Sequence, residues 1–133
     1  MLRCSGAVLW ENLRTVAYLA AGGAIGTVLR YGVSLLFDSS RFPWGTFAVN
    51  FAGSFLLAII FFYLMDGPGV SVQLRLFLFV GVFGAFTTMS TFTVDTVSLF
   101  VNGHYGLATS NVMLNAFLCL LGAFAGRFLS SLL

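Results

Sequence analysis

The sequence predicts an all-α integral membrane protein with four transmembrane helices, and three observations support this fold class. Hydrophobic residues make up 59% of the 133 residues and charged residues only 8%, with a mean hydropathy of +1.02, whereas a soluble domain is about a quarter charged. Uncharged runs cover residues 15–29, 42–65, 76–94 and 96–126, and a spanning helix needs about 20 apolar residues. The alternation typical of membrane barrel strands is missing from the sequence, so the spans must be helical.

The charge content excludes several classes of function. Six Arg, no Lys and four acidic residues cannot cover the surface of a soluble enzyme. A net charge of +2 is too small for binding a phosphate backbone, so we expect no nucleic-acid partner. The predicted surroundings are membrane lipid. Cys4 and Cys119 have no partnered spacing and indicate nothing about redox compartment.

The four spans are expected to form one domain, residues 1–133. The second span should end at the turn residues 66–69 and the third at 102–104. Residues 4–14 are predicted to form a separate, short interfacial helix with Trp10 at the lipid headgroups, rather than a cleaved leader. The predicted spans are about 16–37, 47–65, 74–101 and 107–130.

The arginines bias the orientation only weakly. With four spans both chain ends lie on one side, and that side has four arginines against two on the other, a slight preference for cytoplasmic termini. So small a bias is compatible with insertion in both orientations, and hence with an antiparallel dimer. The two groups are Arg3, Arg14, Arg75 and Arg127 against Arg30 and Arg41.

No group suited to hydrolytic or redox catalysis is found, so the sequence does not predict an enzyme. His104, the single His, lies in a predicted loop without Cys or Asp at ligand spacing. The function must therefore lie in polar groups at membrane depth. Arg30 either snorkels to the interface or lines an aqueous vestibule that attracts anions. Asn50, about one turn into the second span, either offers two uncharged donors or joins neighbouring helices.

The third span contains a dense run of hydroxyl groups. Residues 87–93 include five Ser or Thr side chains, which can bond to backbone carbonyls and stabilise a helix that unwinds. We expect the third helix to be broken at mid-membrane, with carbonyls turned inward to form an ion site. The alternative is a Ser/Thr-rich packing face beside small residues.

Small residues and amides complete the pattern. Gly22 with Gly26, and residues 122 and 126 in the fourth span, are predicted close-packing motifs. Asn111 and Asn115 lie four apart on one face of the fourth span, where they either line a pore or bond between helices.

Three strings in order resemble the CrcB/Fluc family of fluoride channels: GGAIGTVLRY at 22–31, GTFAVNFAGSF at 45–55 and GAFTTMSTFTVD at 84–95. Together they cover nearly the whole of a four-span chain. The resemblance implies a fluoride-selective channel that exports the ion passively and relieves fluoride toxicity. It also implies a bacterial plasma or inner membrane location, and a dual-topology homodimer of antiparallel subunits with two pores along their interface.

The same resemblance implies the site residues. A structural Na⁺ at the dimer centre would be held by backbone carbonyls at Gly84 and Thr87, with Arg30 and Asp95 in the vestibule. The pore would include Asn50, Met89, Ser90, Thr91, Phe92, Thr93 and Asn115.

The chain departs from the family pattern at four positions. Phe92 matches the second of two family Phe residues, but Met89 stands at the first. Asp95 stands where the family usually has Glu. Cys119 and Ala123 stand where relatives have pore hydroxyls.

Two other functions compete with the channel. A small multidrug-type transporter, coupled to protons, needs a membrane-buried acid; the first span has only Arg30, which repels cations, and Asp95 is the one acid inside any span. A non-transporting helper membrane subunit has no use for the polar run 87–93. Fluoride, by contrast, suits neutral amides, hydroxyls and aromatic ring edges, which replace its water without trapping it.

Overall fold

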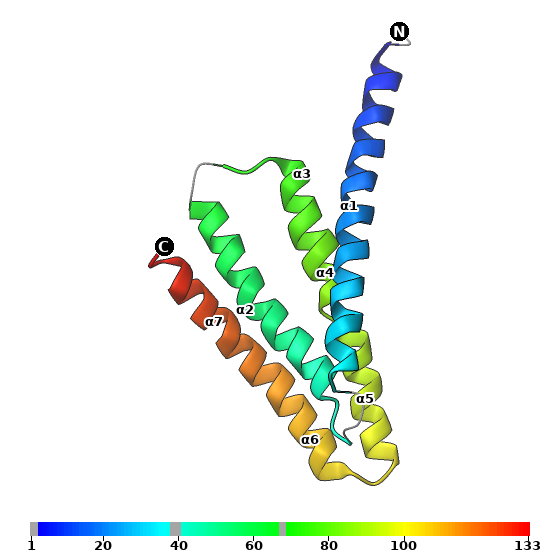
Figure 1. Cartoon of the computed structure of the whole chain (residues 1–133), viewed down its shortest axis with the longest axis vertical. Coiled ribbons are helices and arrows are strands. Elements are labelled where there is room, and N and C mark those ends of the chain that lie inside the picture. Colours follow the sequence, from blue (N-terminus) through cyan, green and yellow to red (C-terminus); the bar gives the residue numbers. More distant parts are fainter. Residues whose placement is uncertain (1–2, 38–40, 67–68) are drawn as a thin grey trace.

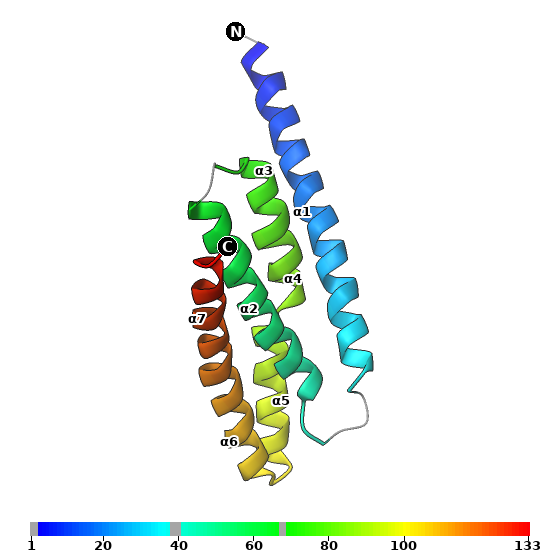
Figure 2. The ribbon, with the colours of Figure 1, turned by 60° about the vertical axis from the view of Figure 1, so that its left-hand side comes forward.

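The computed structural model describes residues 3–37, 41–66 and 69–133, and every regular element in these ranges is helical. Four helical stretches are long and apolar enough to cross a membrane: Leu9–Leu35, Trp44–Leu64, Val72–Val101 and Tyr105–Ser130. The predicted four-span fold is therefore confirmed. Both views place the C-terminal ends of α2 (Trp44–Asp66) and α7 (Cys119–Ser130) toward the side on which α1 (Arg3–Leu35) begins (Figures 1 and 2).

The first span is longer than predicted. α1 runs without interruption from Arg3 to Leu35, about 50 Å, and its N-terminal part extends past the other helices (Figure 2). The prediction of a separate interfacial helix at 4–14 is wrong. No proline or glycine separates this segment from the span, and the Thr15 hydroxyl donates to the Glu11 carbonyl across the expected boundary, over 2.9 Å.

The second span, α2 (Trp44–Asp66), begins three residues earlier than predicted. It ends at the expected turn, of which Gly67 and Pro68 lie outside the described residues. Ser71 then starts the third span, because its Oγ accepts the Leu74 N–H over 3.3 Å.

The third span is broken, as predicted. Its first half comprises α3 (Val72–Arg75), the π-helical η1 (Leu76–Phe83) and α4 (Gly84–Phe86). Thr87 and Thr88 then adopt extended backbone, with ψ angles of 155° and 108°, before α5 (Met89–Val101) resumes the span. The Asn102–Gly103 turn follows, where Gly103 has a φ of +77° that favours glycine.

The fourth span consists of α6 (Tyr105–Met113), the π-helical η2 (Leu114–Leu118) and α7 (Cys119–Ser130). It lies along α2 in both views (Figures 1 and 2). A Cβ on Gly126 would clash with the Phe55 carbonyl, and one on Gly122 would lie 3.0 Å from the Phe51 ring. These glycines therefore let α7 approach α2 closely, which confirms the predicted packing motif.

The first glycine pair has the same role between α1 and the third span. A Cβ on Gly22 would clash with the Phe77 carbonyl, and one on Gly26 with the Val82 carbonyl. The two glycine pairs thus hold the third span against α1 and α7 against α2.

Candidate functional site

The break in the third span is held by the side chain of Asn50, from α2. Asn50 Oδ1 accepts the Thr88 N–H over 2.8 Å, and Asn50 Nδ2 donates to the Thr88 carbonyl over 3.2 Å. One amide thus satisfies both backbone groups of the residue at which the helix is interrupted. An unpaired backbone group at membrane depth costs several kcal/mol, so Asn50 is a structural partner of the break.

Side chains also capture the donors that a continuous helix would use. In an α-helix the N–H of residue 88 bonds to the carbonyl of Gly84, and that of residue 91 to the carbonyl of Thr87. Here the first donates to Asn50, and the Thr91 N–H donates to the Thr88 hydroxyl over 3.2 Å. The usual helical donors of these two carbonyls are therefore bound elsewhere.

A small residue in α2 lets the break approach so closely. A Cβ on Gly53 would clash with the Thr87 methyl group and lie 3.2 Å from the Phe86 ring. The Thr87 hydroxyl turns back to donate to the Phe83 carbonyl over 2.9 Å, closing the last turn of α4.

Buried amides extend from Asn50 into the fourth span. Asn50 Nδ2 donates to Asn115 Oδ1 over 2.9 Å, and Asn115 Nδ2 donates to Asn111 Oδ1 over 3.0 Å. Asn111 Nδ2 donates to the Thr96 hydroxyl over 2.9 Å. Asn111 is fully buried and Asn115 nearly so, at 0% and 9% exposure. Of the two predicted uses of these asparagines, bonding between helices is observed for both.

A pocket of about 320 Å³ opens beside this amide chain. No charged side chain lines it. Five of the predicted site residues line it: Asn50, Thr87, Met89, Phe92 and Asn115. Cys119 lines it too, so both sulfur-containing departures from the family pattern, Met89 and Cys119, lie in its wall. Ala123 is not part of its wall.

The other predicted pore hydroxyls lie around this pocket rather than in it. Ser90 and Thr93 are exposed; Ser90 Oγ lies 3.3 Å from the Thr88 hydroxyl, and Thr93 donates to the Met89 carbonyl over 2.9 Å. Thr91 lines a second pocket, of about 300 Å³, on the other side of Thr88.

Both predicted vestibule residues are found next to Thr91. Arg30 lines the second pocket, and Asp95 lines a third one of about 400 Å³ together with Arg41. Thr46 lines both pockets and donates to Asp95 Oδ2 over 2.7 Å. The two hollows are therefore adjacent, and Arg30 lines one of them.

Sequence reasoning missed Thr46, Thr88 and Thr96 as individual residues. Thr46 lies in the second of the three motif strings and Thr88 in the hydroxyl run, so both had a signal. Thr96 follows that run by three residues, and nothing in the sequence distinguishes it.

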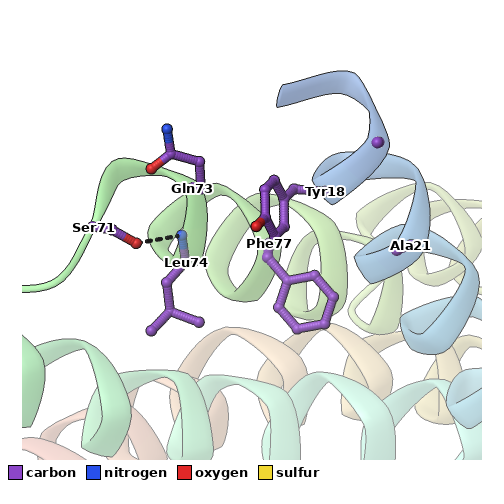
Figure 3. Close-up of a pocket in the computed structure, with 7 residues that line it drawn as sticks. Tyr18, Ala21, Ser71, Gln73, Leu74 and Phe77 are labelled. Atoms are coloured by element: carbon purple, nitrogen blue, oxygen red, sulfur yellow. Dashed lines mark hydrogen bonds between the residues drawn. The ribbon is translucent and has the colours of Figure 1, made fainter. Parts of the chain in front are cut away.

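A further pocket lies away from the break. It has a volume of about 530 Å³ and lies between α1 and the start of the third span; Tyr18 of α1 and Phe77 of the third span both line it (Figure 3). Its wall has no charged side chain and none of the predicted site residues.

A cation at this site would depend on backbone oxygen. Among the described residues no three His, Cys, Asp or Glu side chains cluster as metal ligands. His104 is an exposed residue preceding α6. The carbonyls of Gly84 and Thr87, with their usual donors bound elsewhere, are hard oxygen ligands of the kind that Na⁺ accepts.

Comparison with known proteins identifies the family. A sequence model described as CrcB-like protein, Camphor Resistance (CrcB), matches residues 17–127. The chain belongs to the CrcB family. The resemblance drawn from the three sequence strings is thereby confirmed. The break, the amide chain and all four pockets lie inside the matched CrcB region.

Curated CrcB relatives share most of their length with this chain. A protein named Fluoride-specific ion channel FluC from Agrobacterium fabrum is 42% identical over 114 residues, which are 84% of this chain and 91% of the relative. Proteins of the same name from Dehalococcoides mccartyi and Magnetococcus marinus are 44% and 40% identical, over 89% and 84% of this chain and 93% of each relative.

Proposed function

We propose that this chain is a fluoride-selective channel through which F⁻ leaves the cell passively, relieving fluoride toxicity. The observation that supports it most is the uncharged, hydrogen-bonding wall of the pocket at the helix break. The relatives named as fluoride-specific channels point to the same ion. The proposed location is the plasma or inner membrane of a bacterium.

The donors at the break suit a small, strongly hydrated anion. Both hydrogens of Asn50 Nδ2 already have acceptors, and the contact with the Thr88 carbonyl is the longer of the two, at 3.2 Å against 2.9 Å. Fluoride would replace that carbonyl as acceptor, and the carbonyl would return when the ion leaves. An exchange of one acceptor for another binds weakly enough for conduction.

The Phe92 ring and Met89 contribute to the same wall. An aromatic edge is positively polarised and can face an anion without a formal charge. Met89 is 72% exposed, so its flexible side chain acts mainly as a deformable wall. Ser90, Thr91, Thr93 and Asn115 are the further hydroxyls and amide of the proposed pore.

The vestibule would gather anions before they reach the break. Arg30 lines one hollow, and Arg41 and Asp95 line the neighbouring one. Positive charge in a cleft raises the local anion concentration. No arginine lines the pocket at Asn50, so the ion would not meet a fixed charge that holds it at the narrow part.

We propose in addition a dual-topology homodimer with antiparallel subunits and two pores. The weak arginine bias supports insertion in both orientations, and Gly84 lies exposed at the break, where a second copy could meet it. A structural Na⁺ would be held by the Gly84 and Thr87 carbonyls of both subunits. It would balance the partial negative charge of these oxygens and tie the two breaks together.

Fluoride efflux from liposomes holding the purified protein tests the channel, with chloride efflux as the control. We expect rapid fluoride loss without ATP or a proton gradient, and little chloride loss. Flux that appears only with a proton gradient would favour the small multidrug-type transporter, and no flux of any ion would favour a helper subunit. Labelling of a C-terminal tag from each side of the membrane tests dual topology, which a single orientation would exclude.

A further inference from the structure

The hydrogen bonds at the break run in one direction. The Thr88 N–H donates to Asn50 Oδ1, Asn50 Nδ2 donates to Asn115 Oδ1, and Asn115 Nδ2 donates to Asn111 Oδ1, over 2.8, 2.9 and 3.0 Å. Each amide accepts from the previous group and donates to the next. Because an amide has its acceptor and its donors at opposite ends, turning one amide over breaks the bonds on both of its sides.

This series of side-chain hydrogen bonds ends at Thr96. Asn111 Nδ2 donates to Thr96 Oγ1 over 2.9 Å, and Thr96 Oγ1 donates to the Phe92 carbonyl over 2.8 Å. A hydroxyl has a single hydrogen, and here the carbonyl takes it. The Thr96 oxygen can therefore offer Asn111 only lone pairs, which fixes the direction in which the Asn111 amide points.

We propose that Thr96 is a positioning residue for the pore: through Asn111 and Asn115 it sets the orientation in which Asn50 holds its amide hydrogens. This inference rests on the proposed fluoride conduction. Thr96 lines neither pocket at the break, so it acts through other side chains and not on the ion.

Loss of the Thr96 hydroxyl would affect the hydrogen bonds of Asn111, Asn115 and Asn50 in turn. Without an acceptor, the buried Asn111 amide is free to turn its Nδ2 toward Asn115. Asn115 Nδ2 would then keep only its other bond, to the Asn111 backbone carbonyl over 3.0 Å. Asn115 would be held by one contact instead of two, and its bond to Asn50 would weaken. The Asn50 hydrogen that fluoride needs would therefore be positioned less firmly.

The orientation of the amides can be observed directly. The chain has five asparagines, so protein labelled with ¹⁵N at asparagine gives five pairs of side-chain amide signals. Thr96→Val keeps the shape and removes the hydroxyl; we expect it to shift the pairs from Asn111, Asn115 and Asn50. The exposed Asn12 and Asn102 serve as internal controls. A shift confined to Asn111 would mean a local packing role and would overturn the proposal.

Fluoride efflux then tests the consequence for conduction. Thr96→Val should slow efflux about tenfold, the effect of losing about one buried hydrogen bond of 1.4 kcal/mol, while Thr96→Ser restores it. Thr15→Val removes a hydroxyl with the same local bond, in an exposed part of α1, and should change nothing. Wild-type efflux in a Thr96→Val protein whose Asn50 signals have shifted would refute positioning. If the wild type carries no fluoride, the proposed function fails, whereas the amide signals still decide whether Thr96 orients Asn50.

Discussion

Replacing Asn50 with Asp is the sharpest test of the break. The two side chains have nearly the same shape, but Asp has no amide hydrogens. The contact with the Thr88 N–H at 2.8 Å survives, whereas the contacts with the Thr88 carbonyl at 3.2 Å and with Asn115 Oδ1 at 2.9 Å become oxygen facing oxygen. Asn50→Asp therefore removes two donors and adds a negative charge at the point where the proposed ion passes.

The size of the effect follows from the lost bonds. A lost hydrogen bond that leaves a buried acceptor unpaired costs about 1–3 kcal/mol, so two such contacts amount to about 2–6 kcal/mol at the break. If about 3 kcal/mol of this falls on ion entry, fluoride efflux slows by about 150-fold. The remainder should lower the thermal stability of the folded protein in detergent.

The assay is initial fluoride efflux per amount of reconstituted protein, with gel filtration to establish that the variant is still folded. Asn12→Asp, in the exposed part of α1, introduces the same change far from the break and is the matched control. Efflux from the Asn50→Asp protein within about twofold of wild type would refute both the role of Asn50 in holding the break and its role as a donor to fluoride.

Three further predictions concern the pore wall, the packing and the vestibule. Met89→Phe should keep or raise fluoride efflux and Met89→Leu should slow it, because a ring edge or an S-methyl group faces an anion better than a plain alkyl group does; equal rates in liposomes would leave Met89 as packing. Gly26→Ala should destabilise the bundle by about 1–3 kcal/mol, since its Cβ would meet backbone, whereas Gly23→Ala has open space and should not; thermal unfolding in detergent compares them, and equal midpoints would contradict the packing argument. Arg30→Gln should slow fluoride entry most at low ionic strength, and Arg14→Gln, on the exposed part of α1, should not; an effect independent of salt would mean that Arg30 acts by packing.

The break could be predicted from sequence because its cause is local in part. Hydroxyl side chains can take over backbone bonds wherever they are dense, and Thr88 does so when its hydroxyl accepts the Thr91 N–H. Which residues leave the helix was not predictable, because the decisive partner of Thr88 is Asn50, 38 positions earlier in the chain. The local sequence allows the helix to be interrupted at several residues, and a side chain distant in the sequence determines at which of them it is interrupted.

The error at the first span has a different origin. Charged residues at 3, 11 and 14 limit the apolar run, and the sequence therefore predicts that the spanning helix begins after them. A charge limits burial in lipid, but it does not stop a helix, and Arg3–Leu35 is continuous. The residues of η1 and η2 do not explain why these two segments adopt the wider turns of a π-helix.

The amides illustrate a third limit. Asn111 and Asn115 were recognised as a pair on one face of the fourth span, and the face was correct. Whether they serve a pore or a helix contact depends on what lies opposite, and the structure places Asn50 and Thr96 there. Composition supplied the polar groups, whereas their pairing required the tertiary structure.

The interruption at Thr87 and Thr88 also divides the third span into two helices, each with its own dipole. The peptide dipoles of a helix leave partial negative charge at its C-terminal end and partial positive charge at its N-terminal end. The first half-helix ends at Phe86 and α5 begins at Met89, so both kinds of end meet within three residues. One two-residue gap thus presents a cation-favouring terminus and an anion-favouring terminus at the same depth of the membrane, with no ionised side chain on either residue of the gap.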